Sequence, residues 1–222
     1  MSFRVLFLFV LSFVFALQIQ AQRIIPGAER LDKYLPLLTG MRVAVVMNQT
    51  SRVGNSLLAD ILLKRGIHLV KIFVPEHGFR GTGDAGAHIN SSRDSETGLP
   101  VISLYGNNKK PKVEQLQDVD IVLYDLQDAG ARFYTYISTL QYVMEACAES
   151  DKRLIILDRP NPNGGYVDGP ILDTSLRSFV GMQPIPIVYG MTPGEYARML
   201  VGEHWMKNSE RLRLEVIPCD HW

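Results

Sequence analysis

The sequence predicts an α/β fold in which a mostly parallel sheet is covered by helices on both faces. Short, β-branched apolar runs, such as the one from Arg42 to Met47, are typical of strands that are buried on both sides. These runs alternate along the chain with amphipathic helical patterns, as they do in βαβ units. The chain has 222 residues, of which 46% are hydrophobic, and this is sufficient for one domain with an apolar core.

Each element is expected from its local pattern. The apolar runs predict strands at residues 42–47, 68–74, 101–104, 119–124, 154–157, 185–188 and 212–217. Helical periodicity predicts helices at residues 56–65, 112–117, 134–150 and 193–202. The last helix has the clearest start, because Thr192 and Glu195 form a capping box around Pro193. Residues 78–98 are rich in glycine and polar residues, and we expect a long loop there.

The first 21 residues are predicted to be a secretory signal peptide. Arg4 precedes an apolar run that extends to Leu17, and Ala21 is a suitable residue before a cleavage site. The run is shorter than the roughly 20 residues that a membrane-spanning helix needs. We therefore expect an exported protein, periplasmic or secreted, with no stable membrane insertion after cleavage and a single domain over residues 25–222. An uncleaved N-terminal anchor is the alternative.

Charge and cysteine content disfavour several classes of protein. Lys+Arg and Asp+Glu number 23 each, so no net charge favours nucleic acid or an anionic membrane as a partner. Cys147 and Cys219 do not have the spacing of a metal site. Cys147 lies on an apolar helix face and is predicted to be a small core residue, and a disulfide between the two cysteines remains an open alternative.

No cofactor or metal is expected. The first predicted strand is followed by Asn-Gln-Thr-Ser at 48–51 rather than by a Gly-x-Gly-x-x-Gly turn, which disfavours a dinucleotide. His77, Asp84 and His88 do not match a known pattern of metal ligands.

Polar side chains follow four of the predicted strands. Because parallel strands end at the same edge of a sheet, where α/β proteins bind ligands, we expect these side chains to form one site. The candidates are Asn48, Gln49, Glu76, His77, Arg80, Asp125, Asp128, Arg132, Tyr134, Asp158, Arg159 and Asn161. For each group taken alone, loop solvation, a helix cap or ion pairing between arginines and aspartates is the alternative explanation.

This combination of carboxylates, amides and arginines suits a sugar. Glycoside hydrolysis needs an acid that protonates the leaving oxygen and a second carboxylate or substrate group near the anomeric carbon. Glu76 is the best candidate for the acid, because it follows a strand and lies next to an apolar residue, Phe79, that would raise its pKa. Asp125 and Asp128 are candidates for the second role. The arginines are suited to hold a carboxylate on the substrate.

Four longer motifs resemble one known family. They are Glu-His-Gly-Phe-Arg-Gly at 76–81, the tyrosine-rich run at 124–136, Leu-Asp-Arg-Pro-Asn-Pro-Asn-Gly-Gly at 157–165, and Gly-Pro-Ile-Leu-Asp at 169–173. In this order they resemble the exo-acting β-N-acetylmuramidase family, long catalogued as a domain of unknown function. The resemblance implies a Rossmann-like catalytic domain, followed by a smaller auxiliary domain that we expect to be absent from this chain.

The resemblance also implies a reaction. Members of the family release terminal N-acetylmuramic acid from the non-reducing end of peptidoglycan-derived glycans, and their proposed catalytic glutamate falls on Glu76. The lactyl carboxylate of that sugar gives the arginines a partner. Two alternatives stay open, because a fold does not determine a function. One is a non-catalytic protein that binds sugars or muropeptides on the same scaffold, and the other is a nucleotide- or phosphate-dependent enzyme.

Overall fold

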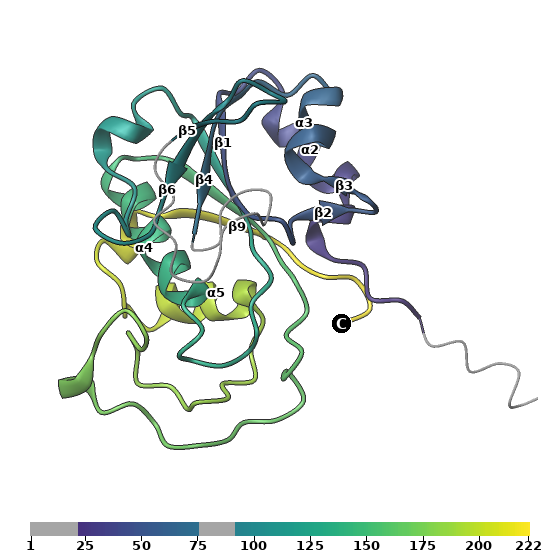
Figure 1. The fold of residues 1–222 in the computed structure, drawn as a ribbon. Helices are drawn as coiled ribbons and strands as arrows, with labels where there is room; N and C mark the ends of the chain where they lie inside the picture. Colours follow the sequence, from purple (N-terminus) through teal and green to yellow (C-terminus); the bar gives the residue numbers. More distant parts are fainter. Residues whose placement is uncertain (1–21, 76–91) are drawn as a thin grey trace, which may run out of the picture.

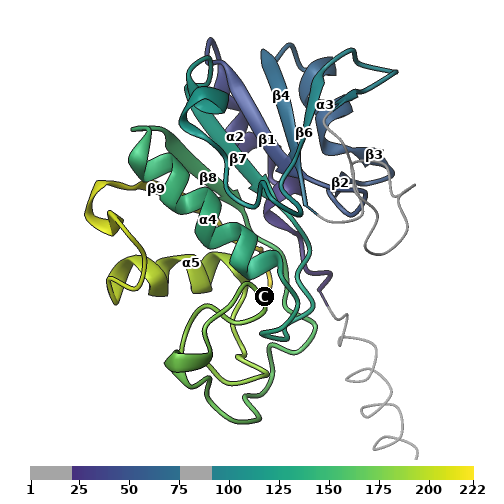
Figure 2. The ribbon, with the colours of Figure 1, turned by 60° about the vertical axis from the view of Figure 1, so that its left-hand side comes forward.

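A seven-stranded sheet forms the centre of the computed structural model, which describes residues 22–75 and 92–222. The strands of this sheet are β1 (Val43–Met47), β4 (Leu69–Val74), β5 (Ser92–Arg93), β6 (Pro100–Ser103), β7 (Ile121–Asp125), β8 (Arg153–Leu157) and β9 (Arg213–Ile217). Their order is β5-β6-β4-β1-β7-β8-β9, and all neighbours are parallel except β5 and β6 (Figures 1 and 2). The predicted mostly parallel sheet is confirmed.

Helices cover both faces of the sheet, as predicted. They are α2 (Leu31–Leu38), α3 (Leu58–Lys64), α4 (Tyr136–Glu149) and α5 (Pro193–Gly202). Figures 1 and 2 show α2 and α3 on one side of the sheet and α4 and α5 on the other. Alternate residues of β1 face the two sides: Val43 and Val45 join the apolar cluster under α2 and α3, whereas Ala44 and Val46 join the cluster under α4 and α5. None of the helices in the described ranges is long and apolar enough to cross a bilayer.

The strand order contains a reversal beside β1. From β1 the chain moves outward through β4 to β6, then returns to the other side of β1 and moves outward again through β7, β8 and β9. This is the order of doubly wound Rossmann-like sheets, in which ligands bind outside the carboxyl ends of the strands at the reversal. The ends are level, because Val46 pairs with both Phe73 and Tyr124, and Met47 pairs with Asp125. The reversal therefore lies between β1 and β7, where these two strands end.

The prediction of a strand at residues 185–188 is wrong. In the structure this segment belongs to the long connection between β8 and α5, which lies below α5 in Figure 1. Val188 makes only isolated bridges, to Ala131 and Asp168. Pro184 and Pro186 explain the difference, because proline has no backbone N–H to donate and is excluded from the interior of a sheet.

Smaller elements also differ from the prediction. Residues 56–57 form β3 (Ser56–Leu57), which pairs with β2 (Arg52–Val53), so the helix predicted from residue 56 begins at Leu58. The predicted helix 112–117 is a 3-10 turn. The described 3-10 turns are η1 (Gly27–Glu29), η2 (Val113–Leu116), η3 (Thr174–Leu176) and η4 (Ser209–Arg211). Helix α2 was not predicted, since Pro36 lies within it and interrupts the helical signal.

Candidate active site

Asn48 connects the end of β1 to the start of α4. Its side chain is fully buried, and its Nδ2 donates a hydrogen bond to the hydroxyl of Tyr136 over 2.8 Å. Its Oδ1 accepts from the backbone N–H of Thr50 over 2.9 Å. Gln49 follows, and its Oε1 is buried without a hydrogen-bond partner among the described residues. The structure therefore places both predicted amides at the strand reversal, one of them with all its polar atoms engaged.

Asp125 and Arg159 form a buried ion pair across β7 and β8. The guanidinium donates through Nε at 2.5 Å and through a terminal nitrogen at 3.0 Å, one bond to each carboxylate oxygen. Burial acts to lower the pKa of Arg159, but the Asp125 carboxylate outweighs it and raises that pKa. The same terminal nitrogen also donates to the backbone carbonyl of Arg52 over 3.4 Å, so the guanidinium is engaged within the fold. The ion-pair alternative considered for the arginines is therefore the one that Arg159 adopts.

Asp128 is buried, and no cation among the described residues pairs with it. Its Oδ2 accepts from the backbone N–H of Gly130 over 2.6 Å and from the hydroxyl of Tyr189. Its Oδ1 is buried and has no partner among the described residues. Burial raises the pKa of Asp128 to about 6, against the opposing effect of the two hydrogen bonds. A carboxyl with this pKa exchanges its proton near neutral pH, as an acid or base in catalysis must.

Gly130 is required beside this carboxyl. Its φ is +74°, and a Cβ there would come within 2.0 Å of Oδ1 of Asn161. Asn161 in turn donates to the carbonyl of Met191 over 2.8 Å and accepts from the N–H of Asn163 over 2.7 Å. The loops after β7 and β8 are thus locked together, and they keep Asp128 in place.

Asp158 caps helix α5. Its carboxylate accepts from Oγ1 of Thr192 and from the N–H of Gly194, each over 2.7 Å, and from the N–H of Arg159 over 3.0 Å. Burial raises its pKa, and these donors oppose the shift. All of these bonds are internal to the fold, so the structure gives Asp158 a positioning role at the start of α5.

The remaining predicted residues fall into two groups. Arg132 donates to the carbonyls of Pro170 and Ile185 in the long connection before α5. Tyr134 is 37% exposed and packs edge-to-face on Tyr136, with the ring centroids 4.7 Å apart, so it is an accessible aromatic side chain at this edge. Glu76, His77 and Arg80 lie outside the described residues.

Sequence reasoning missed Tyr189, which donates a hydrogen bond to the carboxyl of Asp128. Burial, reinforced by the Asp128 carboxylate, raises the pKa of Tyr189, so its hydroxyl stays protonated and remains a donor. A signal for it was present. Tyr189 directly follows the predicted run 185–188, and the strand-end rule that selected the other candidates would have selected it too. Among the described residues, no three His, Cys, Asp or Glu side chains are grouped to hold a metal.

The fold and this carboxyl edge define a Rossmann-like α/β domain with a buried carboxyl of raised pKa at its strand reversal. The chain belongs to the family described as "Exo-beta-N-acetylmuramidase NamZ, N-terminal", which matches residues 43–222. It is 45% identical over 196 residues to "Peptidoglycan beta-N-acetylmuramidase NamZ" of Bacillus subtilis (strain 168), covering 86% of this chain and 46% of that protein.

Two crystal structures of DUF1343 family proteins from Bacteroides fragilis NCTC 9343 have the same fold. One is 47% identical, with a TM-score of 0.82 over 90% of this chain and 53% of the other. The second is 41% identical, with a TM-score of 0.83 over 90% of this chain and 51% of the other. The chain therefore spans about half the length of the relatives that it matches.

Proposed function

We propose that this chain is the catalytic domain of an exo-β-N-acetylmuramidase. It would release terminal N-acetylmuramic acid from the non-reducing end of peptidoglycan-derived glycans. The name of the Bacillus subtilis relative supports the β-N-acetylmuramidase activity and the peptidoglycan substrate. The exo mode rests on the description of the matching family.

The observation that carries the proposal is the burial of Asp128 together with its raised pKa. Three carboxyls, those of Asp125, Asp128 and Asp158, are buried at the carboxyl edge of the sheet. Arg159 occupies both oxygens of Asp125, and α5 and its flanking residues occupy Asp158. Asp128 alone of the three keeps an oxygen without a partner among the described residues, and burial raises its pKa to about 6. Of the two candidates for the second catalytic carboxyl, Asp128 is thus the better one.

Glu76 is proposed as the general acid. It is the second residue after Val74, the last residue of β4, and β4 is paired with β1 on the side opposite β7. Strands in a sheet are about 4.8 Å apart, so the end of β4 lies about 10 Å from the end of β7. In the proposed reaction Glu76 protonates the glycosidic oxygen as the glycosidic bond breaks. Asp128 is the second carboxylate, which assists at the anomeric carbon.

The test is hydrolysis of a chromogenic β-N-acetylmuraminide by the full-length protein and by its Glu76→Gln variant. We expect a loss of about a hundredfold or more in kcat, the scale of general acid catalysis. Glu114→Gln is a matched control, because Glu114 is exposed in η2, and it should retain full activity. Equal activity in parent and Glu76→Gln would remove Glu76 from the mechanism. Absence of hydrolysis in both, with retained binding of N-acetylmuramic acid, would favour the sugar-binding alternative.

We also propose that the protein acts outside the cytoplasm after removal of residues 1–21. The support is the sequence pattern of that segment, with an arginine, an apolar run and a small residue before the cleavage point. Mass spectrometry of the mature protein should find Gln22 at the N-terminus, and an intact Met1 would overturn the proposal.

A further inference from the structure

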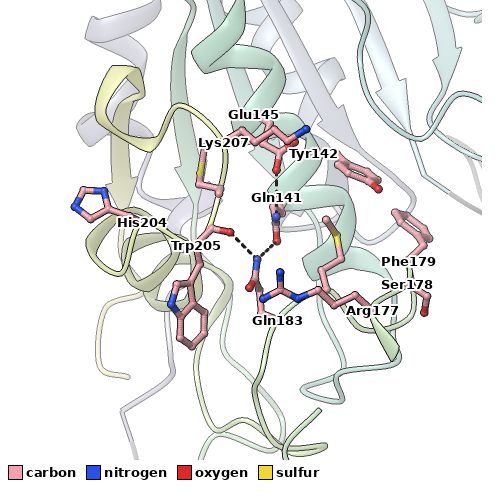
Figure 3. A pocket seen from close by; sticks show the side chains of 12 residues that line it. Gln141, Tyr142, Glu145, Arg177, Ser178, Phe179, Gln183, His204, Trp205 and Lys207 are labelled. Carbon is pink, nitrogen blue, oxygen red and sulfur yellow. Dashed lines mark hydrogen bonds between the residues drawn. The ribbon is translucent and has the colours of Figure 1, made fainter. Parts of the chain in front are cut away.

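A second candidate site lies on the outer side of α4, away from the carboxyl edge. It is a cavity of about 480 Å³, within the size range of small-molecule sites. Its walls come from the middle of α4, from the loop that follows η3 and from the turn that follows α5, as Figure 3 shows. Neither Asp125 nor Asp128 lines it. Its residues have no role in the reaction proposed above.

A chain of amide groups inside the cavity has a fixed direction. Gln183 donates through Nε2 to the backbone carbonyl of Trp205 over 2.8 Å and to Oε1 of Gln141 over 2.9 Å (Figure 3). Gln141 donates in turn to the carboxylate of Glu145 over 3.1 Å. A carbonyl and an ionised carboxylate can only accept, so the two ends of the chain determine the orientation of both amides.

This orientation leaves one acceptor unused. Gln183 is only 2% exposed, and its Oε1 is buried without a partner among the described residues. Buried polar atoms in folded proteins are almost always hydrogen-bonded, and an exception calls for an explanation. A ligand that places an O–H or N–H donor in the cavity would satisfy this oxygen.

The cavity also carries positive charge. Arg177 and Lys207 line it, and neither forms an ion pair with a carboxylate in the described part of the chain. Glu145 lies in the same wall, but Lys110 pairs with it over 3.2 Å. The whole chain has equal numbers of basic and acidic residues, so this local excess of cations favours a ligand with a negative charge.

Aromatic rings complete the walls. Tyr142 and Phe179 stack with their centroids 5.7 Å apart and their planes at 14°, and both line the cavity together with Trp205. Such rings give a flat apolar surface against which the C–H face of a sugar ring can pack, while polar groups around it bind the hydroxyls. Aromatic surface, the Gln183 acceptor and two cations without a carboxylate partner in the described ranges together define a site for a sugar that bears a carboxylate and a donor group.

We propose that this cavity binds a carboxylate-bearing N-acetylated sugar at a position separate from the catalytic edge. The carboxylate would lie on Arg177 and Lys207, and an N–H or O–H group would donate to Oε1 of Gln183. The N-acetyl group and the choice of N-acetylmuramic acid as the probe rest on the proposed function, whereas the carboxylate and the donor group follow from the cavity itself. Such a site would hold a second unit of an acidic glycan.

The experiment is a titration followed by the fluorescence of Trp205, in a Trp222→Phe background that leaves one indole in the chain. N-acetylmuramic acid is compared with N-acetylglucosamine, which lacks the lactyl carboxylate. We expect saturable binding of the acid and at least about tenfold weaker binding of the neutral sugar, the scale of one charge-assisted contact. Equal binding of the two sugars, or no binding of either, would overturn the proposal.

Variants locate the binding. Arg177→Gln with Lys207→Gln should weaken binding of the acid by about tenfold or more, because both cations are removed. Lys64→Gln, an exposed change at the end of α3, is the matched control and should bind as the parent does. Gln183→Met should also weaken binding, provided that its unfolding transition matches the parent's. Unchanged binding in the double variant would place the sugar elsewhere.

The experiments can refute the catalytic proposal and the cavity proposal independently of each other. Glu76→Gln should abolish hydrolysis and leave the Trp205 titration unchanged. Binding at the cavity without hydrolysis in the parent protein would refute the catalytic proposal alone. Hydrolysis without a Trp205 response would refute the cavity proposal alone.

Discussion

Asp125 and Asp128 lie at the same end of β7, and both are buried, yet their surroundings differ. Asp125 belongs to an inner region, in which Arg159 takes both carboxylate oxygens. Asp128 belongs to an outer region, in which a backbone N–H and the hydroxyl of Tyr189 share one oxygen and the other has no partner among the described residues. Both carboxyls are buried. They differ because the Arg159 guanidinium bonds to Asp125, whereas no cation among the described residues bonds to Asp128.

This difference separates stability from chemistry. Burial raises the pKa of Asp125 as well, and Arg159 opposes that shift while the ion pair connects the ends of β7 and β8. Asp128 has no cation beside it among the described residues, and burial raises its pKa to about 6, so its carboxyl can exchange a proton near neutral pH. The inner region therefore connects two strand ends, and the outer region contains the carboxyl that we propose takes part in the reaction.

The largest effect on stability is expected from Asp125→Ala. The change leaves the Arg159 guanidinium buried without its counter-ion, which costs about 3–5 kcal/mol in the free energy of unfolding. Denaturant unfolding of the two proteins measures the difference. Glu215→Ala is the control, because it removes a half-exposed ion pair with Arg153 and should cost less than about 1 kcal/mol. Equal losses in the two variants would show that the buried pair contributes no more than a surface pair.

Asp128→Asn is expected to change the free energy of unfolding by a comparable amount, but only through its dependence on pH. The folded-state pKa of Asp128 is about 6, above the ordinary 3.8, so the folded protein binds this proton more tightly than the unfolded chain does. The resulting stabilisation is present below pH 4 and is lost as the pH rises to about 6. A shift of about two units corresponds to roughly 3 kcal/mol.

The neutral asparagine has no such dependence. The free energy of unfolding of the variant should therefore gain on that of the parent by up to about 3 kcal/mol between pH 4 and pH 7. Urea unfolding at several pH values measures this, and hydrolysis by the same variant should fall. Parallel pH curves for the two proteins would contradict the assignment of Asp128 as a carboxyl with a raised pKa.

Most of the sheet could be predicted from the sequence because its strands are apolar on both faces. A run such as Val43–Met47 is buried at every position, and no loop or surface helix has that pattern. Prediction was weaker where a proline contradicted the pattern. Pro36 lies inside α2, and Pro186 lies inside the run that was predicted as a strand. In both cases contacts with the rest of the domain, which periodicity does not reveal, decide the local structure.

For the candidate site, the sequence located the residues better than it assigned their roles. Strand ends are visible in a sequence, and the structure does place Asn48, Asp125 and Asp158 at one edge. The partner of each carboxyl is not visible, because Arg159 and Tyr189 reach β7 from other parts of the chain. A role in a buried site depends on those partners.

The smallest expected change in the free energy of unfolding concerns Asp158, the third buried carboxyl of this edge. Like Asp128 it has no cation, but three neutral donors satisfy it, one of them the hydroxyl of Thr192. Thr192 also accepts from the N–H of Glu195 as the N-cap of α5. We expect Thr192→Ala to cost about 1–2 kcal/mol in the free energy of unfolding, the range for loss of a helix cap.

Thr174→Ala, an exposed change in η3, is the control for Thr192→Ala and should fall within about 0.5 kcal/mol of the parent. The two are compared by denaturant unfolding at pH 7. A loss in Thr192→Ala no larger than the control would mean that Asp158 does not depend on its neutral donors. Asp158 would then resemble Asp128, whose hydrogen bonds leave one oxygen unused in the described ranges, rather than Asp125, which its partner holds. The bonded partners of the three carboxyls would then no longer explain how their roles differ.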